Sequence, residues 1–322
     1  MTITIRPETV RDFNGIARLT EEAFEINFLN DNKTATHIGE IALVDHLRHW
    51  EHHDPELALV AEVDGELAGH VMFTPYRVKC YGTSLLPACL SILSVPPRFQ
   101  RMGVGGALVR EGLKAVRRKG HPFSYLYGHD SYYPKFGYRT AMFGTAGVTL
   151  AAGDFAARKF EERALEAPML PGLMAMHERS FEGVALALEP STQMMEWKSW
   201  VPFVTTSGLY DGQRLFAYVR YAMEGGTLAV KRVIAGNAED LALAAGHLFS
   251  LAPRAESLAL PLHPASPVLS GLAFTPSLEA WAAGMLLVLD EGCVEIQRYC
   301  DDIHRDKMKL GMITWPIFFD WQ

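Results

Sequence analysis

The run from Leu93 to Val109 constrains the fold of this chain more than any other part of the sequence. A strand pattern over residues 85–95 stops at Pro96-Pro97, where the missing N–H groups cannot continue a ladder. From Gly103 onward, apolar residues recur at the spacing of one helical face. The run therefore predicts a strand, a tight turn and a helix whose glycine-rich first turn offers backbone N–H groups to an anion such as a diphosphate.

Two alternative roles for these glycines are a dinucleotide-binding turn and close helix packing. A dinucleotide-binding turn needs a parallel strand–helix–strand unit with an acidic residue about twenty positions later. The strand-like runs at 57–63 and 67–74 instead flank Asp64-Gly65, a pair typical of a tight antiparallel hairpin, and so favour mixed strands. Close helix packing explains Gly112 better than it explains Gln100-Arg101 beside three glycines. We therefore expect a bound diphosphate, with Arg101 as an added cation.

The first half of the chain alternates strand and helix patterns. These patterns predict a strand at 2–6, helices at 10–24 and 41–50, the two hairpin strands, the strand at 85–95, a helix at 104–119, a strand at 123–127, a short segment at 131–136 and a further strand after Gly137-Tyr138. We expect an α/β (α+β) fold with a central mixed, largely antiparallel twisted sheet flanked by helices.

The length of 322 residues is about twice that of a typical domain, so we expect two domains. A charged and then proline-containing stretch at 151–171 predicts the boundary. We therefore predict a first domain over 1–152, a linker over 153–172 and a second domain over 173–322. The second domain shows a similar order of patterns, with helices expected at 173–181, 191–201 and 238–251 and strands at 215–221, 227–234 and 257–262. The alternative is that this domain is an unrelated α/β domain.

Composition limits the classes of function. The net charge of −7 argues against nucleic acid as the main partner. The N-terminus has a strand pattern and no apolar run reaches membrane-spanning length, so we expect a cytoplasmic protein without a membrane partner. The cysteines form no CxxC pair and have no metal-ligand spacing with histidine, so we expect no metal site: Cys80, Cys89, Cys293 and Cys300.

The sequence Gln100-Arg101-x-Gly103-x-Gly105, after a strand ending Leu93-Ser94-Val95, resembles the acetyl-CoA motif of the GNAT superfamily of N-acetyltransferases. The segment Tyr133–Tyr138 is similar to the family's Tyr-x-x-x-Gly-Phe element, with Tyr138 where phenylalanine is commoner. The resemblance covers residues 3–150. It implies that acetyl-CoA, as co-substrate, is held by Leu93, Ser94, Val95, Gln100, Arg101, Met102, Gly103, Val104, Gly105, Gly106 and Ala107.

The two-domain layout resembles the enhanced-intracellular-survival-type acetyltransferases, in which a second GNAT-like domain lacks the cofactor motif. The strand at 227–234 likewise runs into Ala235-Gly236-Asn237 without the glycine pattern, so residues 173–322 are expected to be a degenerate GNAT-like domain. That family also carries a sterol-carrier-like domain, for which residues 292–322 are too few. The aromatic tail Trp315–Gln322 covers the second domain's core, or lines the acceptor site or an oligomer interface, so a homo-oligomer stays open.

Moving an acetyl group from a thioester to an amine needs a neutral amine, a stabilised oxyanion and a proton for the thiolate. The resemblance implies that the main chain of Leu93 and Val95 follows the acetyl-pantetheine arm. It implies Tyr133 as general acid, because a phenol stays protonated at neutral pH. The alternative is that Tyr132 and Tyr133 only pack against the helix.

The general base is less defined by the sequence. His70 on the hairpin strand would titrate near neutrality and is the predicted base, with a hydrogen-bonded structural histidine as the alternative. His129, near the predicted acid in the sequence, is a second candidate base. Four candidates for lining the acceptor site stay open: Glu22, His52, His53 and Asp130.

The resemblance implies direct attack of a primary amine on acetyl-CoA, without a covalent enzyme intermediate or a metal. The amine acceptor, a small molecule or a peptide, is not defined by the sequence. A non-catalytic acyl-CoA-binding or sensor protein is the alternative function, and an NAD-linked enzyme using the same glycines is a second rival.

Overall fold

The structure is a computed structural model. It describes residues 1–30, 39–199, 201 and 203–313, and for residues 25–30 it describes the backbone only. The chain forms two compact units. The first contains Met1–Tyr76, Leu86–Thr140 and Ala282–Ile296, and the second contains Arg77–Leu85, Ala141–Trp281 and the chain from Gln297. The predicted tail Trp315–Gln322 lies outside the described residues.

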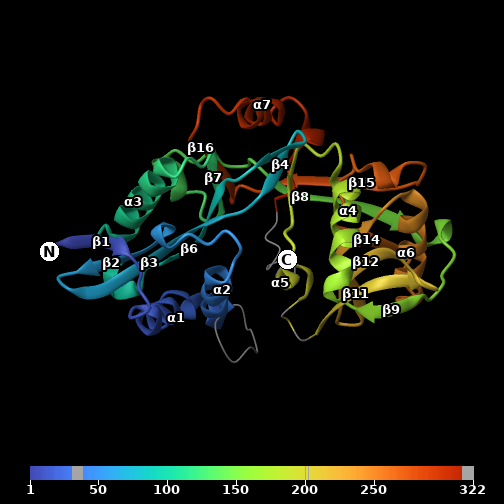
Figure 1. The fold of residues 1–322 in the computed structure, drawn as a ribbon, viewed down its shortest axis with the longest axis horizontal. Coiled ribbons are helices and arrows are strands. Elements are labelled where there is room, and N and C mark those ends of the chain that lie inside the picture. Colours follow the sequence, from blue (N-terminus) through green and yellow to red (C-terminus); the bar gives the residue numbers. More distant parts are fainter. Residues whose placement is uncertain (31–38, 200, 202, 314–322) are drawn as a thin grey trace. The chain divides into compact units, whose positions relative to one another are not determined.

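A six-stranded sheet in the order β1-β2-β3-β6-β7-β16 forms the centre of the first unit (Figure 1). Every neighbouring pair is antiparallel except β6 and β7, which are parallel, so the predicted mixed, largely antiparallel sheet is confirmed. The strands are β1 (Ile3–Pro7), β2 (Ala58–Val63), β3 (Glu66–Pro75), β6 (Ala88–Ser94), β7 (Phe123–Tyr127) and β16 (Gly284–Val288); the helices are α1 (Phe13–Asn30), α2 (Gly39–Arg48) and α3 (Val104–Arg118).

The hairpin between β2 and β3 is confirmed. Val63 pairs with Glu66 across the two-residue loop, and Asp64 and Gly65 both have positive φ, 50° and 88°. This is the conformation that a tight hairpin turn requires at both central positions. The turn fixes the register of β3, and therefore which of its side chains face each side of the sheet.

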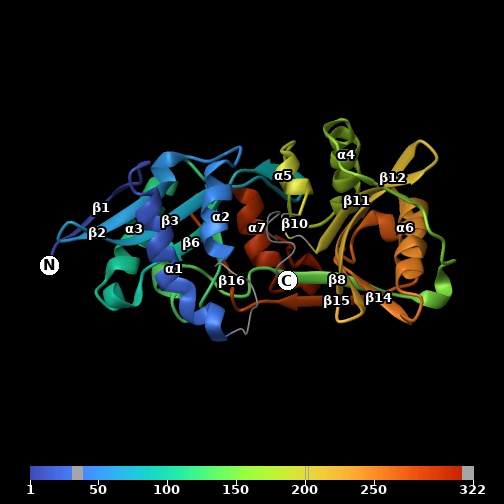
Figure 2. The same cartoon turned by 90° about the horizontal axis from the view of Figure 1, so that it is seen from below.

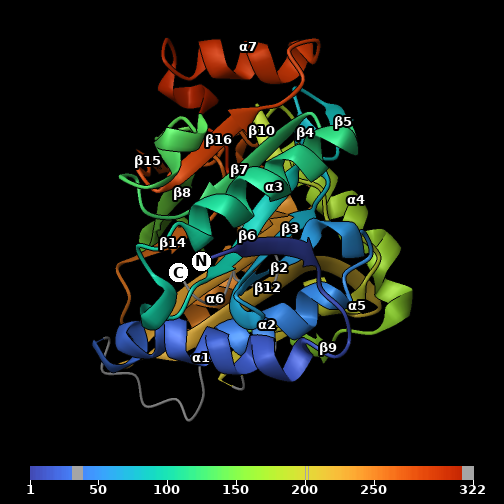
Figure 3. The ribbon, with the colours of Figure 1, turned by 90° about the vertical axis from the view of Figure 1, so that its left-hand side faces the viewer.

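Helices cover both faces of this sheet. Figures 1 and 3 show α3 along one face and α1 with α2 along the other. Alternate residues of β3 separate the two sides: Val71 and Phe73 join the apolar cluster of α3, whereas His70 faces the other way. Gly112 lets α3 approach closely, because a methyl group there would lie 2.1 Å from a ring carbon of Phe73.

Strands β6 and β7 separate soon after they meet. They pair only at Ala88 with Ser124 and Cys89 with Tyr125. Strand β6 nevertheless stays paired with β3 as far as Ser94. A register shift between Leu90 and Ile92 leaves Ser91 with no opposite residue on β3. From Leu90 onward, β6 therefore has an edge without pairing to β7, and this edge leads into the turn before α3.

The predicted strand at 85–95 is two strands. Strand β5 (Thr83–Leu85) ends and β6 begins at Ala88, because Pro87 between them cannot donate to a ladder. Strand β5 pairs with β4 (Val78–Cys80) through a turn at Tyr81-Gly82, and β4 pairs with β10 (Leu186–Leu188) in the second unit. This short hairpin was not predicted from the sequence.

The second unit contains a sheet in the order β13-β12-β11-β9 and a second sheet in the order β14-β8-β15. Figure 2 shows α4 and α6 on opposite sides of strands β11 and β12. The helices and strands of the second unit are β8 (Gly144–Ala151), β9 (Glu161–Ala164), α4 (Leu170–Phe181), α5 (Met194–Trp197), β11 (Val204–Asp211), β12 (Arg214–Glu224), β13 (Thr227–Ala235), α6 (Ala238–Leu251), β14 (Ser257–Leu260) and β15 (Thr275–Ala280), besides β4, β5 and β10. The chain passes from the first unit to the second within helix α7 (Val294–Asp302).

The order β11, β12, β13, α6, β14 repeats the order β2, β3, β6, α3, β7, as the predicted second copy requires. The predicted helix at 191–201 is wrong in length. Among the described residues of this range, only Met194–Trp197 are helical, because the chain is extended at Lys198 and the N–H of Ser199 donates to the hydroxyl of Thr206 on β11.

The compact units are not consecutive along the chain, unlike the predicted division at 153–172. Strand β8, inside the predicted first domain, pairs with β14 and β15 of the second unit. Strand β16, inside the predicted second domain, pairs with β7 of the first unit. An alternating pattern predicts a strand but not its partner, so the sequence could not reveal this exchange. The division into a catalytic domain over 1–152 and a second domain over 173–322 stays a prediction.

Candidate active site

The turn between β6 and α3 has an unusual backbone. Arg101 and Gly103 both lie in the left-handed region, with φ of 63° and 89°. The side-chain amide of Gln100 donates a hydrogen bond to the carbonyl oxygen of Val95 at 3.0 Å and closes the loop. The N–H of Ala107 makes the first bond of the helix, to Gly103 O. The N–H groups of residues 103–106 consequently have no acceptor within the helix and carry its positive dipole end.

A cavity of about 860 Å³ lies over this turn, entirely within the first unit. It is lined by the turn, the end of β6, one face of α1 and the segment after β7. The lining residues are Glu22, Ala23, Phe24, Leu93, Val95, Pro97, Phe99, Gln100, Arg101, Gly103, Val104, Gly105, Gly106, Arg110, His129, Tyr132, Tyr133 and Lys135.

The cavity gathers most of the predicted cofactor residues. Eight of them line it: Leu93, Val95, Gln100, Arg101, Gly103, Val104, Gly105 and Gly106. Ser94, Met102 and Ala107 are not among its lining residues. Ser94 is buried and accepts a hydrogen bond from Thr20 at 3.2 Å, and Met102 packs against the apolar core.

Gly105 and Gly106 allow neighbouring side chains to lie close to the turn. A methyl group at Gly105 would lie 2.8 Å from the hydroxyl oxygen of Tyr132, and one at Gly106 would lie 3.3 Å from the guanidinium of Arg110. Glycine at these positions therefore lets the Tyr132 hydroxyl and the Arg110 guanidinium lie close to the first turn of α3.

Cations gather on this side of the cavity. Besides Arg101 it is lined by Arg110 and Lys135, whose Nζ lies 3.6 Å from the ring centroid of Tyr132. These two residues were not singled out from the sequence. Arg110 follows Gly106 by one helical turn, so helical spacing could have placed it beside the motif. The helix dipole and the three cations together favour a negatively charged ligand.

Tyr133 lies in the wall of the cavity with 8% of its surface exposed. Its ring packs edge-on against Tyr132 at 5.1 Å and against Tyr138 at 6.1 Å. Gly128 makes room for it, since a methyl group there would lie 2.4 Å from the ring. Burial raises the pKa of Tyr133 above its ordinary value, so the phenol is protonated at neutral pH and can donate.

His70 lies elsewhere. Its side chain is fully buried, does not line the cavity, and places Nε2 3.0 Å from a carboxylate oxygen of Glu8. Arg48 binds the same carboxylate at 2.8 and 3.0 Å and stacks on Phe13 at 3.7 Å. Burial lowers the pKa of His70, although Glu8 opposes this effect. The structure thus places His70 in a buried ionic cluster.

The remaining candidates are dispersed. Glu22 and His129 line the cavity, and Glu22 pairs with Arg98 at its rim. Asp130, His52 and His53 are not among the lining residues. Three cysteines are buried and Cys293 is partly exposed, and within the described ranges no group of three histidine, cysteine or acidic side chains could hold a metal ion. No described helix combines the length and apolar character needed to cross a membrane.

Comparison with known proteins agrees with this geometry. Residues 4–141 match the family described as acetyltransferase (GNAT) domain. An uncharacterised N-acetyltransferase of Escherichia coli K12, YjhQ, is 38% identical over 99 residues, which are 31% of this chain and 55% of that protein. This chain therefore spans about half the length of that curated relative.

Solved structures are similar over most of the chain. A probable N-acyltransferase from Enterococcus faecalis V583 has a TM-score of 0.66 at 15% identity, over 90% of this chain and 73% of that chain. Eis1 from Mycobacterium abscessus has a TM-score of 0.61 at 18% identity, over 90% of this chain and 74% of that chain. At these identities the similarity shows a shared fold.

Proposed function

We propose that this chain, whose residues 4–141 match the acetyltransferase (GNAT) domain family, is an acetyl-CoA-dependent N-acetyltransferase that transfers acetyl directly to a primary amine. The turn at residues 100–106 carries the proposal. It combines unpaired helix N–H groups, glycines and nearby cations at the mouth of one cavity. This is the arrangement that a diphosphate requires.

The cofactor is proposed to lie from the turn along β6. The oxygens of its diphosphate accept hydrogen bonds from the N–H groups of residues 103–106, and Arg101, Arg110 and Lys135 supply positive charge nearby. Its pantetheine arm follows the edge of β6 that β7 leaves unpaired, where the main chain of Leu93 and Val95 is available. An extended arm can hydrogen-bond to such an edge as an added strand does.

In the proposed reaction the neutral amine attacks the thioester carbonyl carbon and forms a tetrahedral oxyanion. An N–H of the unpaired β6 edge stabilises this oxyanion. Collapse of the intermediate breaks the C–S bond, and the departing thiolate takes the hydroxyl proton of Tyr133. The former amine nitrogen gives up its extra proton to solvent as the amide forms, and the phenolate of Tyr133 takes a proton back from solvent. Tyr133 is protonated before transfer, as a general acid must be, although burial raises its pKa and so makes the phenol a weaker donor.

The geometry supports a positioning role for His70 in place of the predicted role as base. A base must reach the amine, whereas His70 is fully buried and faces Glu8. His70 lies opposite Ser94 in the β3–β6 register, one residue from the main chain proposed to follow the cofactor. If His70 positions this strand, His70→Gln changes the acetyl-CoA KM but leaves the pH dependence of kcat in place. Loss of the acidic limb of that profile would instead support His70 as the base, because a base must be deprotonated to act.

The test compares two adjacent tyrosines. Tyr133→Phe is expected to keep acetyl-CoA binding by calorimetry and to lower thiol release with an accepted amine by about 10²-fold or more, the usual contribution of a general acid. Tyr132→Phe is the matched control and is expected to keep most of its turnover. Equal turnover in Tyr133→Phe and the parent chain would exclude Tyr133 as the acid.

The same assays separate the alternative functions. If no amine in a mass-spectrometric panel of small molecules and peptides is acetylated although acetyl-CoA binds, the chain is an acyl-CoA-binding or sensor protein. Binding of NADH in place of acetyl-CoA would support the nucleotide-linked rival. A panel of this kind also identifies the acceptor, which we propose to be a small-molecule or peptide amine.

A further inference from the structure

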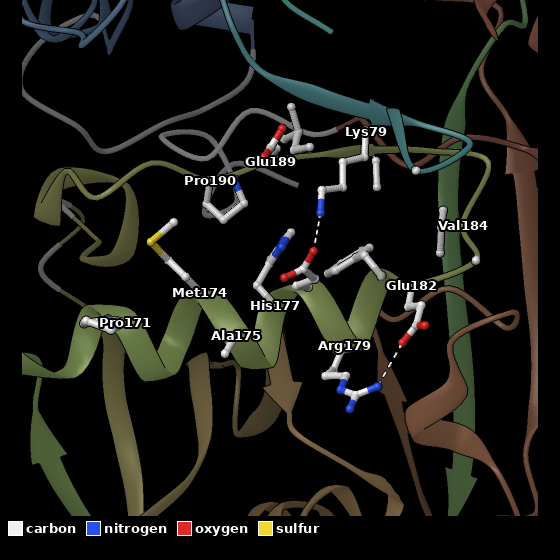
Figure 4. Close-up of a pocket in the computed structure, with 16 residues that line it drawn as sticks. Lys79, Pro171, Met174, Ala175, His177, Arg179, Glu182, Val184, Glu189 and Pro190 are labelled. Carbon is white, nitrogen blue, oxygen red and sulfur yellow. Dashed lines mark hydrogen bonds and ion pairs between the residues drawn. The ribbon is translucent and has the colours of Figure 1, made fainter. Parts of the chain in front are cut away.

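The second unit has a cavity of its own, about 810 Å³ in volume, that the proposed acetyl transfer does not use. Figure 4 shows helix α4 along one side of it and Lys79 of strand β4 opposite. Met174, Phe181, Leu188 and Pro190 give it an apolar lining. The volume lies in the range of sites that hold small organic molecules.

One polar side chain in this cavity is buried without a partner. His177 projects from α4 into the cavity and is 4% exposed (Figure 4). Its ring stacks on Phe181 at 4.5 Å and meets Trp197 edge-on at 6.4 Å. Nε2 has no hydrogen-bond partner within the described part of the chain. A buried ring nitrogen of this kind is unfavourable unless another molecule satisfies it.

The charges that act on His177 are both positive. Burial lowers its pKa well below the ordinary value, and Arg232 and Lys79 lower it further. The ring is therefore neutral at pH 7 and retains one N–H donor. When this proton is on Nε2, the unpartnered nitrogen is a donor, and the positive charges of Arg232 and Lys79 favour an anion as its partner.

Lys79 can accept such an anion. Its Nζ lies 2.5 Å from Glu178, whose side chain is 66% exposed. An ion pair this open to solvent is weak, so a ligand anion can replace the Glu178 carboxylate. Glu178, Glu182 and Glu189 line the same cavity, however, and their negative charge disfavours a dianion such as phosphate.

We propose that this cavity binds a monocarboxylate with an apolar body. Its carboxylate accepts hydrogen bonds from the His177 ring and the Lys79 ammonium. Its apolar body lies along Met174, Phe181 and Pro190. Every residue that lines this site belongs to the second unit, whereas the proposed acetyl-transfer site lies in the first.

Calorimetric titration of the full chain tests the proposal with n-octanoate, n-octylamine and inorganic phosphate as probes, with and without saturating acetyl-CoA. Octanoate is expected to bind in both conditions, and the other two probes much more weakly. Lys79→Met and His177→Phe are expected to weaken octanoate binding about tenfold each, the usual loss for one hydrogen bond to a charged group. His177→Phe keeps the aromatic stack and removes both nitrogens.

Arg179→Met is the matched control. Arg179 lines the same cavity but is held by Glu182 and points away from His177 (Figure 4), so its loss is expected to leave octanoate affinity unchanged. The proposal is overturned if octylamine binds as tightly as octanoate, if acetyl-CoA displaces octanoate, or if Lys79→Met binds octanoate like the parent chain. Lys79 is a partly exposed residue, so this last result stands even if His177→Phe fails to fold.

Discussion

The buried cluster of Glu8, Arg48 and His70 predicts a large effect of one carboxylate on stability. The side chains of Glu8 and Arg48 are only 4% and 8% exposed. Burial alone would raise the pKa of Glu8, but its contacts with His70 and Arg48 outweigh burial and lower the pKa from 4.5 to about 2. At 1.36 kcal/mol for each pKa unit, this depression corresponds to about 3 kcal/mol. Removal of one partner from a buried ion pair typically costs a similar amount, about 3–5 kcal/mol.

Glu8→Gln is therefore expected to lower the free energy of unfolding by about 3 kcal/mol at pH 7. The unfolded carboxyl takes up its proton near pH 4.5, whereas the folded one stays ionised until about pH 2. The contribution of Glu8 is thus complete above pH 4.5 and is lost as the pH falls through about 2. The difference between Glu8→Gln and the parent chain should shrink across the same interval.

Urea unfolding followed by tryptophan fluorescence measures this, because Trp50 is buried in the first unit and stacks on Tyr76 at 4.9 Å. Asp45→Asn is the matched control: Asp45 binds the same Arg48 at 2.9 Å but is 67% exposed, so less than about 1 kcal/mol is expected. The reasoning fails if Glu8→Gln is as stable as Asp45→Asn, or if its deficit is the same at pH 7 and at pH 3.

Three glycine substitutions and one control substitution test the site and its support. Gly103→Ala places a methyl group at φ 89°, a conformation that costs a non-glycine residue about 1–2 kcal/mol. The acetyl-CoA dissociation constant, measured by calorimetry, should therefore rise about tenfold. Gly120→Ala is the control: Gly120 has φ 80° but lies beyond the other end of α3, so its substitution should leave this dissociation constant unchanged. Gly112→Ala should lower stability in urea, because overpacking against the adjacent ring costs about 1–3 kcal/mol and exceeds the gain in helix propensity; a more stable variant would contradict the close contact. Gly128→Ala should displace the ring of Tyr133 and lower kcat while acetyl-CoA binding persists; an unchanged kcat would argue against Tyr133 as the acid.

The turn and the hairpin could be predicted because their requirements are local. Proline ends β6, and glycine allows the left-handed conformations at 65 and 103, so a few neighbouring residues determine the backbone. The turn and the hairpin together explain why most of the predicted cofactor residues line one cavity. Lys135 enters the cavity from the segment after β7, and the glycine motif does not identify it; Arg110 lies one helical turn after Gly106, so helical spacing could have placed it.

The environment of His70 could not be predicted, because it depends on contacts far apart in the sequence. Glu8 follows β1 and Arg48 ends α2, and neither pattern indicates that both charges are buried beside β3. A lone histidine on a strand is consistent with a base or with a structural residue. The exchange of β8 and β16 has a similar cause, since strand periodicity carries no information on the partner.

The position of β16 also affects how the protein is made. Synthesis on a ribosome proceeds from the N-terminus, and the family match ends at residue 141, long before Gly284–Val288 emerges. Until then the outer edge of β7 lacks the partner that it has in the folded protein, and an open edge is a template for pairing with other chains. During about half of its synthesis, the nascent chain therefore has a central sheet that lacks its last strand, with the β7 edge either open or protected.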